Sequence, residues 1–115
     1  MIPLDEVRER YMRDPVPVRL GGIAANLARI RSCSARGIGV AAVADMLRES
    51  VCMLEWTAIE AGEELAGELV ELQIQLALWS LRWPATATNP VQRVEVSSLA
   101  GQWSDRLLAM SGLLA

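Results

Sequence analysis

The stretch Thr57–Pro84, TAIEAGEELAGELVELQIQLALWSLRWP, decides the fold, because its pattern predicts one long central helix. Thr57 followed three residues later by Glu60 is typical of a capping box, which satisfies free amide groups at a helix start. Pro84 predicts the end, because proline has no amide hydrogen and disfavours helical geometry in the residue before it. The predicted helix covers 58–83 and is about 39 Å long at 1.5 Å per residue.

This predicted helix carries two apolar stripes. Period-two alternation over residues 71–76 would suit a strand, but the Leu, Ala, Glu and Gln around it favour a helix. The spacing of four and three residues defines a first stripe of Leu65, Leu69, Leu72, Leu76, Trp79 and Trp83. The second stripe consists of Ala66, Val70, Ile74, Ala77 and Leu81. A helix apolar on most of its circumference is typical of a bundle centre or a subunit interface. Our interface candidates are Leu72, Leu76, Trp79 and Trp83.

Four further helices are expected, over residues 3–13, 17–35, 40–56 and from Pro90 to before Gly112. Gly37 is a typical helix C-terminus, and Asn89 before Pro90 is a typical N-terminus. The expected inward faces are Leu4, Val7 and Tyr11; Leu20, Ile23, Leu27, Ile30 and Ser34; Val40, Val43, Leu47, Val51 and Leu54; and Val96, Leu99, Trp103, Leu107 and Met110. Gly21-Gly22 indicates either a close helix contact or a later helix start.

Short connections between these helices predict an all-α single domain over residues 1–115. The expected architecture is an up-and-down four-helix bundle with a short extra N-terminal helix. Small residues at Ala58, Gly62 and Ala66 indicate either a close helix approach or a loosened helix start.

Composition limits the environment of the chain. Hydrophobic residues make up 52%, and mean hydropathy is +0.25. The longest charge-free part of the central helix is shorter than the ~18 residues of a membrane span. The N-terminus is charged from residue 5, unlike a secretory signal. We therefore expect a cytoplasmic protein that contacts no membrane, has Cys33 and Cys52 as free thiols, and uses its surplus apolar surface in a homo-oligomer.

Charge is distributed unevenly along the chain. Residues 1–36 hold seven Arg and four acids, whereas residues 37–83 hold eight acids and two Arg. The arginines include Arg19, Arg29, Arg31 and Arg36. They do not indicate a nucleic-acid partner, because the chain is acidic overall, with a pI near 4.9. The favoured interpretation is a solvated face, or pairing with the acidic hairpin across the bundle or a dimer. The absence of His excludes Ser-His-Asp, Cys-His and His-based zinc sites.

An acidic face on the central helix suggests an alternative function, a metal site that could support catalysis. Glu60, Glu64, Glu68 and Glu71 are spaced by four, four and three residues, and carboxylates suit Mg²⁺ or Mn²⁺. Glu68 and Glu71 resemble the E-x-x-E pair of all-α nucleoside triphosphate pyrophosphatases, although the second, E-x-x-D pair is missing. A metal site would use Glu64, Glu68 and Glu71. The simpler interpretation is a solvated face near a helix N-terminus, where acids are favourable.

Three segments carry a further resemblance: DPVPVRLGGIAANLARI (14–30), EWTA (55–58) and LVELQ (69–73). With these segments the chain resembles small uncharacterised helical proteins of cyanobacteria, a resemblance that implies no known activity. We expect a non-enzymatic protein–protein interaction module that associates with itself and needs no cofactor. The alternative is a Mg²⁺- or Mn²⁺-dependent nucleotide or phosphate hydrolase that uses the acidic face of the 58–83 helix.

Overall fold

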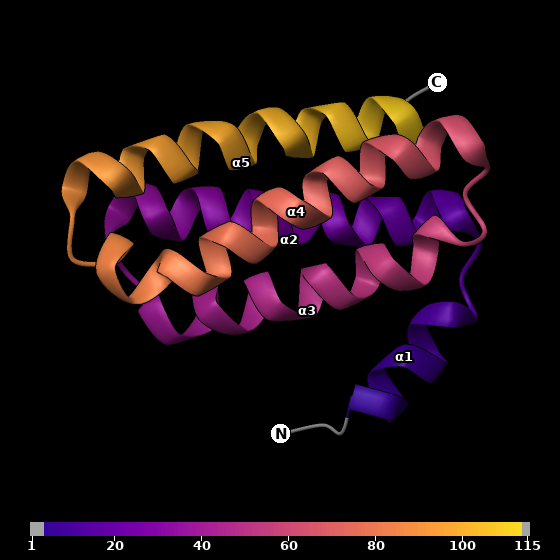
Figure 1. Cartoon of the computed structure of the whole chain (residues 1–115), viewed down its shortest axis with the longest axis horizontal. Helices are drawn as coiled ribbons and strands as arrows, with labels where there is room; N and C mark the ends of the chain where they lie inside the picture. Colours follow the sequence, from indigo (N-terminus) through magenta and orange to yellow (C-terminus); the bar gives the residue numbers. More distant parts are fainter. Residues whose placement is uncertain (1–3, 114–115) are drawn as a thin grey trace.

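The computed structural model describes residues 4–113, which form five helices and no strand (Figure 1). The helices are α1 (Leu4–Met12), α2 (Val16–Arg36), α3 (Val40–Ala58), α4 (Glu63–Thr86) and α5 (Pro90–Ser111). The all-α class is therefore confirmed. Pro3, where the first helix was expected to begin, lies outside the described residues.

The four longer helices run alternately in opposite directions along the long axis, and α1 lies to one side near α3 (Figure 1). Contact is closest between α2 and α5 and between α3 and α4, whereas α4 and α5 touch along only a small part of their lengths. No helix within residues 4–113 is long and apolar enough to cross a membrane.

Helix α2 forms as its apolar spacing predicts. All five residues of its expected face are buried: Leu20, Ile23, Leu27, Ile30 and Ser34. Gly37 ends the helix with φ +66°, and its amide donates to the Cys33 carbonyl. Gly21 and Gly22 lie inside α2, so the later start is wrong. A Cβ on Gly21 would come within 2.9 Å of Leu113 Cδ1, the end of an exposed side chain just beyond α5, so the contact at Gly21 is with a side chain and not with another helix.

The single helix predicted for residues 58–83 is wrong at both ends. Helix α3 continues to Ala58, a turn follows, and α4 begins after Gly62, whose φ of +82° suits glycine. Thr57 is therefore not an N-cap. It lies buried in the last turn of α3, where its hydroxyl donates to the Met53 carbonyl at 2.8 Å. The physical reason is chain reversal: residues 59–62 are needed to turn α4 back along α3.

Pro84 does not end α4, which runs on to Thr86. A proline near a helix C-terminus removes one backbone hydrogen bond but leaves the last turn able to close. The Ala87 amide donates to the Trp83 carbonyl at 2.8 Å. The Trp83 indole also donates to the Val40 carbonyl at 2.9 Å, which fixes this end of α4 against the start of α3. Val40 itself, expected to face inward, is exposed.

Helix α5 begins and ends at the predicted residues. The Asn89 side chain accepts from the amides of Val91 and Gln92, both at 3.1 Å, and Pro90 takes the first helical position. Gly112, with φ +77°, is the C-cap. Of its expected face, Val96, Trp103 and Leu107 are buried, and Leu99 and Met110 are half-buried.

The close approach of two helices occurs between α2 and α5. Ser97 donates to the Arg31 carbonyl at 2.9 Å, and Ser104 donates to the Ala24 carbonyl at 2.8 Å. Between the two serines lies Gly101, where a Cβ would come within 2.8 Å of Arg31 Cδ. In the sequence, a close approach of two helices was considered at the small residues Ala58, Gly62 and Ala66. The small residues of α5 that do allow such an approach, Ser97, Ala100, Gly101 and Ser104, were not recognised.

Two glycines in and before α4 should respond oppositely to alanine. Gly62→Ala should destabilise the protein by about 1–3 kcal/mol, because its backbone angles suit only glycine. Gly67→Ala should stabilise it by about 0.5–1 kcal/mol, because Gly67 lies inside the helix with open space around it. Urea unfolding of both variants measures the two shifts. Equal shifts would contradict a break between α3 and α4.

Candidate functional site

Helix α4 is apolar on two opposite sides. Its buried stripe contains Leu69, Leu72, Leu76, Trp79 and Trp83. All four sequence-derived interface candidates belong to this stripe and pack inside the single chain. At 100° per residue the opposite side holds the apolar residues that we call the outer face: Val70, Ile74, Ala77, Leu78 and Leu81. Ile74 is 58% exposed and Leu81 is 78% exposed.

The outer face continues toward α3. A shallow pocket of about 350 Å³ lies between α3 and α4 and is lined mainly by apolar atoms, from Arg48, Val51, Cys52, Ala77, Ser80 and Leu81. Cys52 is a free thiol, as is Cys33. Burial raises the pKa of the Cys52 thiol, and the nearby carboxylates of Glu55 and Glu49 add to the effect. A raised thiol pKa lowers the reactive thiolate fraction, so nothing here suggests a nucleophile.

One edge of the outer face is charged and the other is not. Glu71 and Arg82 are exposed and lie along the edge nearer α5. Neither forms an ion pair with another residue of the 4–113 segment. Gln73 and Ser80 lie along the opposite edge, nearer α3, and are half-buried. The outer face is thus an apolar stripe with one pair of free opposite charges beside it.

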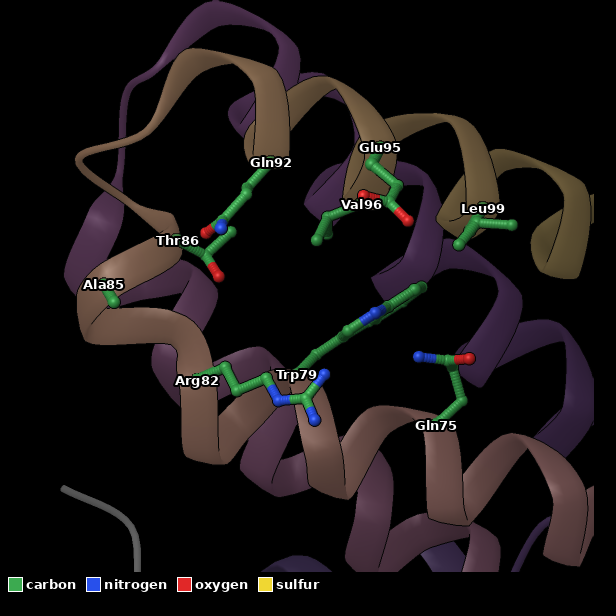
Figure 2. A pocket seen from close by; sticks show the side chains of 9 residues that line it. All are labelled: Gln75, Trp79, Arg82, Ala85, Thr86, Gln92, Glu95, Val96 and Leu99. Carbon is green, nitrogen blue, oxygen red and sulfur yellow. The ribbon is translucent and has the colours of Figure 1, made fainter.

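A cleft opens where α4 and α5 diverge, with a volume of about 380 Å³ (Figure 2). The Trp79 ring lies across it and the Thr86 hydroxyl points into it, while Arg82 and Glu95 stand on opposite walls (Figure 2). The remaining lining residues are Gln75, Ala85, Gln92, Val96 and Leu99. Its volume is at the lower end for small-molecule sites. Its lining holds no Ser, Cys or His that could act as a nucleophile or an imidazole base.

The acidic residues do not form the expected single face. Glu60 lies in the turn before α4 and pairs with Arg19 at 3.2 Å, and Glu68 pairs with Arg106. Glu64 lies with Glu63 and Glu68 along a shallow pocket of about 480 Å³. Glu71 lies at the charged edge of the outer face. Across residues 4–113, no group of three or more Asp, Glu or Cys side chains is placed to hold a metal ion.

Arg19 pairs with an acid of the α3–α4 hairpin, which is one of the two expectations for the arginines. Its burial was not expected, since it is only 4% exposed. Its guanidinium donates to the carbonyls of Asp14 at 2.8 Å and Met12 at 3.2 Å, as well as to Glu60. The available signal was its position four residues before Ile23, on the buried stripe of α2. Arg19 thus connects the end of α1 to the turn between α3 and α4.

Tyr11 completes this connection. Its hydroxyl lies 2.8 Å from the Thr57 hydroxyl and donates to the Arg19 carbonyl at 3.2 Å, and its ring packs on Trp56. Burial raises the pKa of Tyr11 to about 12, although the Thr57 hydrogen bond and the Arg19 charge oppose this effect. The folded protein therefore holds the phenol proton more tightly than the unfolded chain does.

This pKa predicts a pH effect on stability. The contribution of Tyr11 should be fully present below pH 10 and should be lost as the pH rises through about 12. The sequence has one tyrosine, so phenolate absorbance reports Tyr11 alone. We expect a midpoint near 12 in the native protein and near 10 in urea. A native midpoint near 10 would contradict the burial of this hydroxyl.

Three surfaces therefore stand out: the outer face of α4, the α4–α5 cleft and the acidic pocket at the start of α4. The outer face departs furthest from an ordinary helix surface, because large apolar side chains lie where polar ones are usual.

Comparison with known proteins found no relative of this chain: no protein-family model, curated protein or solved structure matches it.

Proposed function

We propose that the protein is a non-enzymatic helical module that associates with itself and acts through protein–protein contacts. The observation that supports this most directly is the outer face of α4. One side of this helix fills the core of its own chain, and the opposite side presents four large apolar residues to solvent: Val70, Ile74, Leu78 and Leu81. A contiguous apolar patch bordered by polar residues is typical of a contact surface.

The finer description of the fold belongs to the same proposal. We infer an up-and-down four-helix bundle formed by α2 to α5, opened between α4 and α5, with α1 appended beside α3. The alternating directions of the helices support it (Figure 1). A cytoplasmic location is also inferred, since two free cysteines are typical of proteins in a reducing compartment.

A pair of equally exposed residues tests self-association. Leu81 on the outer face and Val91 on α5 are both 78% exposed. In sedimentation velocity at high micromolar concentration, we expect a dimer for the unaltered protein and for Val91→Glu, but a monomer for Leu81→Glu. Both variants should keep the helical circular dichroism spectrum, because both side chains lie in solvent. A monomeric unaltered protein would overturn the proposal.

The metal-dependent hydrolase is the second candidate, and it would use Glu64, Glu68 and Glu71 of α4, of which Glu64 and Glu68 line the pocket at the start of this helix. The Glu68–Arg106 ion pair weakens it, because that carboxylate already has a partner. Its test is the melting temperature with millimolar Mg²⁺ or Mn²⁺ and a nucleotide. A ligand at 100 times its Kd should add about 2.7 kcal/mol of stability. A rise that disappears when Glu68 and Glu71 become Gln would favour the hydrolase, and no rise would remove it.

A further inference from the structure

We infer that the surface which covers the outer face of α4 is α4 of a second copy, antiparallel to the first and related to it by a twofold axis near Ala77. This inference rests on the proposed self-association and specifies its geometry. In the view of Figure 1, α4 lies in front of α2, so the side of α4 that faces away from the core is free of other elements (Figure 1).

The spacing of the outer face is self-complementary. When two identical helices pair antiparallel about a perpendicular twofold axis, residues equally distant from the axis meet each other. Val70 pairs in this way with Leu81, and Ile74 pairs with Leu78, since the midpoints of both pairs fall at residues 75–76. Ala77 lies next to the axis, where a small side chain lets two helix backbones approach closely.

The charges select the direction of the second helix. Glu71 and Arg82 are eleven residues apart, which is three helical turns, so they share one edge of the outer face. The twofold axis brings this edge against the same edge of the second copy. Glu71 then faces the partner subunit's Arg82, and Arg82 faces the partner subunit's Glu71. A parallel pair would instead bring this edge against the uncharged edge of the second copy, so neither charge would gain an opposite partner.

The uncharged edge fits the same axis. Gln73 and Ser80 have their midpoint between residues 76 and 77, as Glu71 and Arg82 do. Antiparallel pairing therefore places the Gln73 amide against the partner subunit's Ser80 and introduces no like charges. Neither Glu71 nor Arg82 has to give up an ion pair within its own chain to make these contacts.

Charge reversal tests the register. Glu71→Arg alone and Arg82→Glu alone each place like charges across the axis twice. We expect the dimer Kd to rise about tenfold in each single variant. The double variant Glu71→Arg/Arg82→Glu should return to within about threefold of the original Kd, because opposite charges again face each other. Two weakened single variants with no recovery in the double variant would overturn the register.

Disulfide formation tests the direction independently. In a chain whose Cys33 and Cys52 are replaced by Ala, Ala77→Cys should form a covalent dimer under mild oxidation, because the two copies of residue 77 lie beside the axis. Val70→Cys should not, since its two copies would lie about 20 Å apart. A chain with both Val70→Cys and Leu81→Cys should cross-link. A cross-linked Val70→Cys variant would indicate a parallel pair and would overturn the inference.

The experiments distinguish an error in the antiparallel arrangement from an error in the proposed self-association. A dimer that Leu81→Glu dissociates, but that shows neither charge recovery nor the Ala77→Cys link, would retain the proposed function and overturn the antiparallel arrangement. A monomeric unaltered protein, or a dimer insensitive to Leu81→Glu, would overturn both. Circular dichroism of every variant identifies any loss of fold.

Discussion

Leu76→Glu should unfold the protein, whereas Ile74→Glu should leave it folded. The two residues are two positions apart on α4, yet Leu76 has no exposed surface and Ile74 is 58% exposed. An unpaired carboxylate in an apolar core costs several kcal/mol, a large part of the ~5–15 kcal/mol that stabilises a typical domain. A substitution at an exposed helix position usually changes the free energy of unfolding by less than about 0.5 kcal/mol.

Circular dichroism with urea unfolding measures this contrast, and sedimentation velocity measures association in the same samples. We expect Ile74→Glu to be a folded monomer, because its carboxylate would lie in the α4–α4 contact. Leu76→Ala is the milder core variant and should cost about 2–5 kcal/mol without abolishing the fold. If Leu76→Glu folded normally and Ile74→Glu did not, the assignment of the two sides of α4 would be reversed.

A second large effect is expected for Arg19→Ala, which should lower the free energy of unfolding by about 3 kcal/mol. The substitution leaves the carbonyls of Met12 and Asp14 without the guanidinium, and hydrogen bonds that involve a charged group contribute about 1.5–3 kcal/mol each. Part of this is recovered, because the half-exposed Glu60 carboxylate gains access to water. Arg19→Lys should recover less than half of the loss, since an ammonium cannot reproduce the planar fork.

Urea unfolding gives the size of this effect, and limited proteolysis locates it. We expect cleavage near Arg13 to accelerate in Arg19→Ala, because α1 is held mainly through this side chain and Tyr11. Arg29, an exposed arginine of the same helix, is the matched control, and Arg29→Ala should change neither quantity. A loss of stability equal in the two variants would show that Arg19 acts as ordinary surface charge.

Local signals in the sequence were sufficient for several elements. The apolar spacing of α2, the Gly37 terminus and the Asn89-Pro90 start of α5 each depend on neighbours within one or two turns, and all three are confirmed. The two stripes of α4 were also visible. Sequence could not tell which stripe faces the core, because that depends on how α3, α2 and α5 surround the helix.

Signals with two physical meanings misled the prediction. A threonine before a helix can cap it, but a threonine inside a helix can donate to the carbonyl four residues earlier, and Thr57 does the latter. Pro84 likewise can follow a helix or lie within its final turn. The burial of Arg19 was missed because a charge on an apolar stripe is expected at the surface unless several acceptors surround it. The carbonyls of Met12 and Asp14 are close in sequence, but they point at Arg19 only because of the α1–α2 turn, and Glu60 comes near only through the fold.

The pairing of α2 with α5 determines when this fold can form during synthesis. Residues 37–89 separate the two helices, whereas α3 and α4 follow each other across four residues. Local hairpins form quickly, and contacts between distant segments form late. On the ribosome, the side of α2 that packs on α5 therefore stays uncovered until α5 is available, even after α3 has folded against α2. We expect incomplete chains that lack α5 to be the ones that chaperones bind, since they leave this side of α2 uncovered.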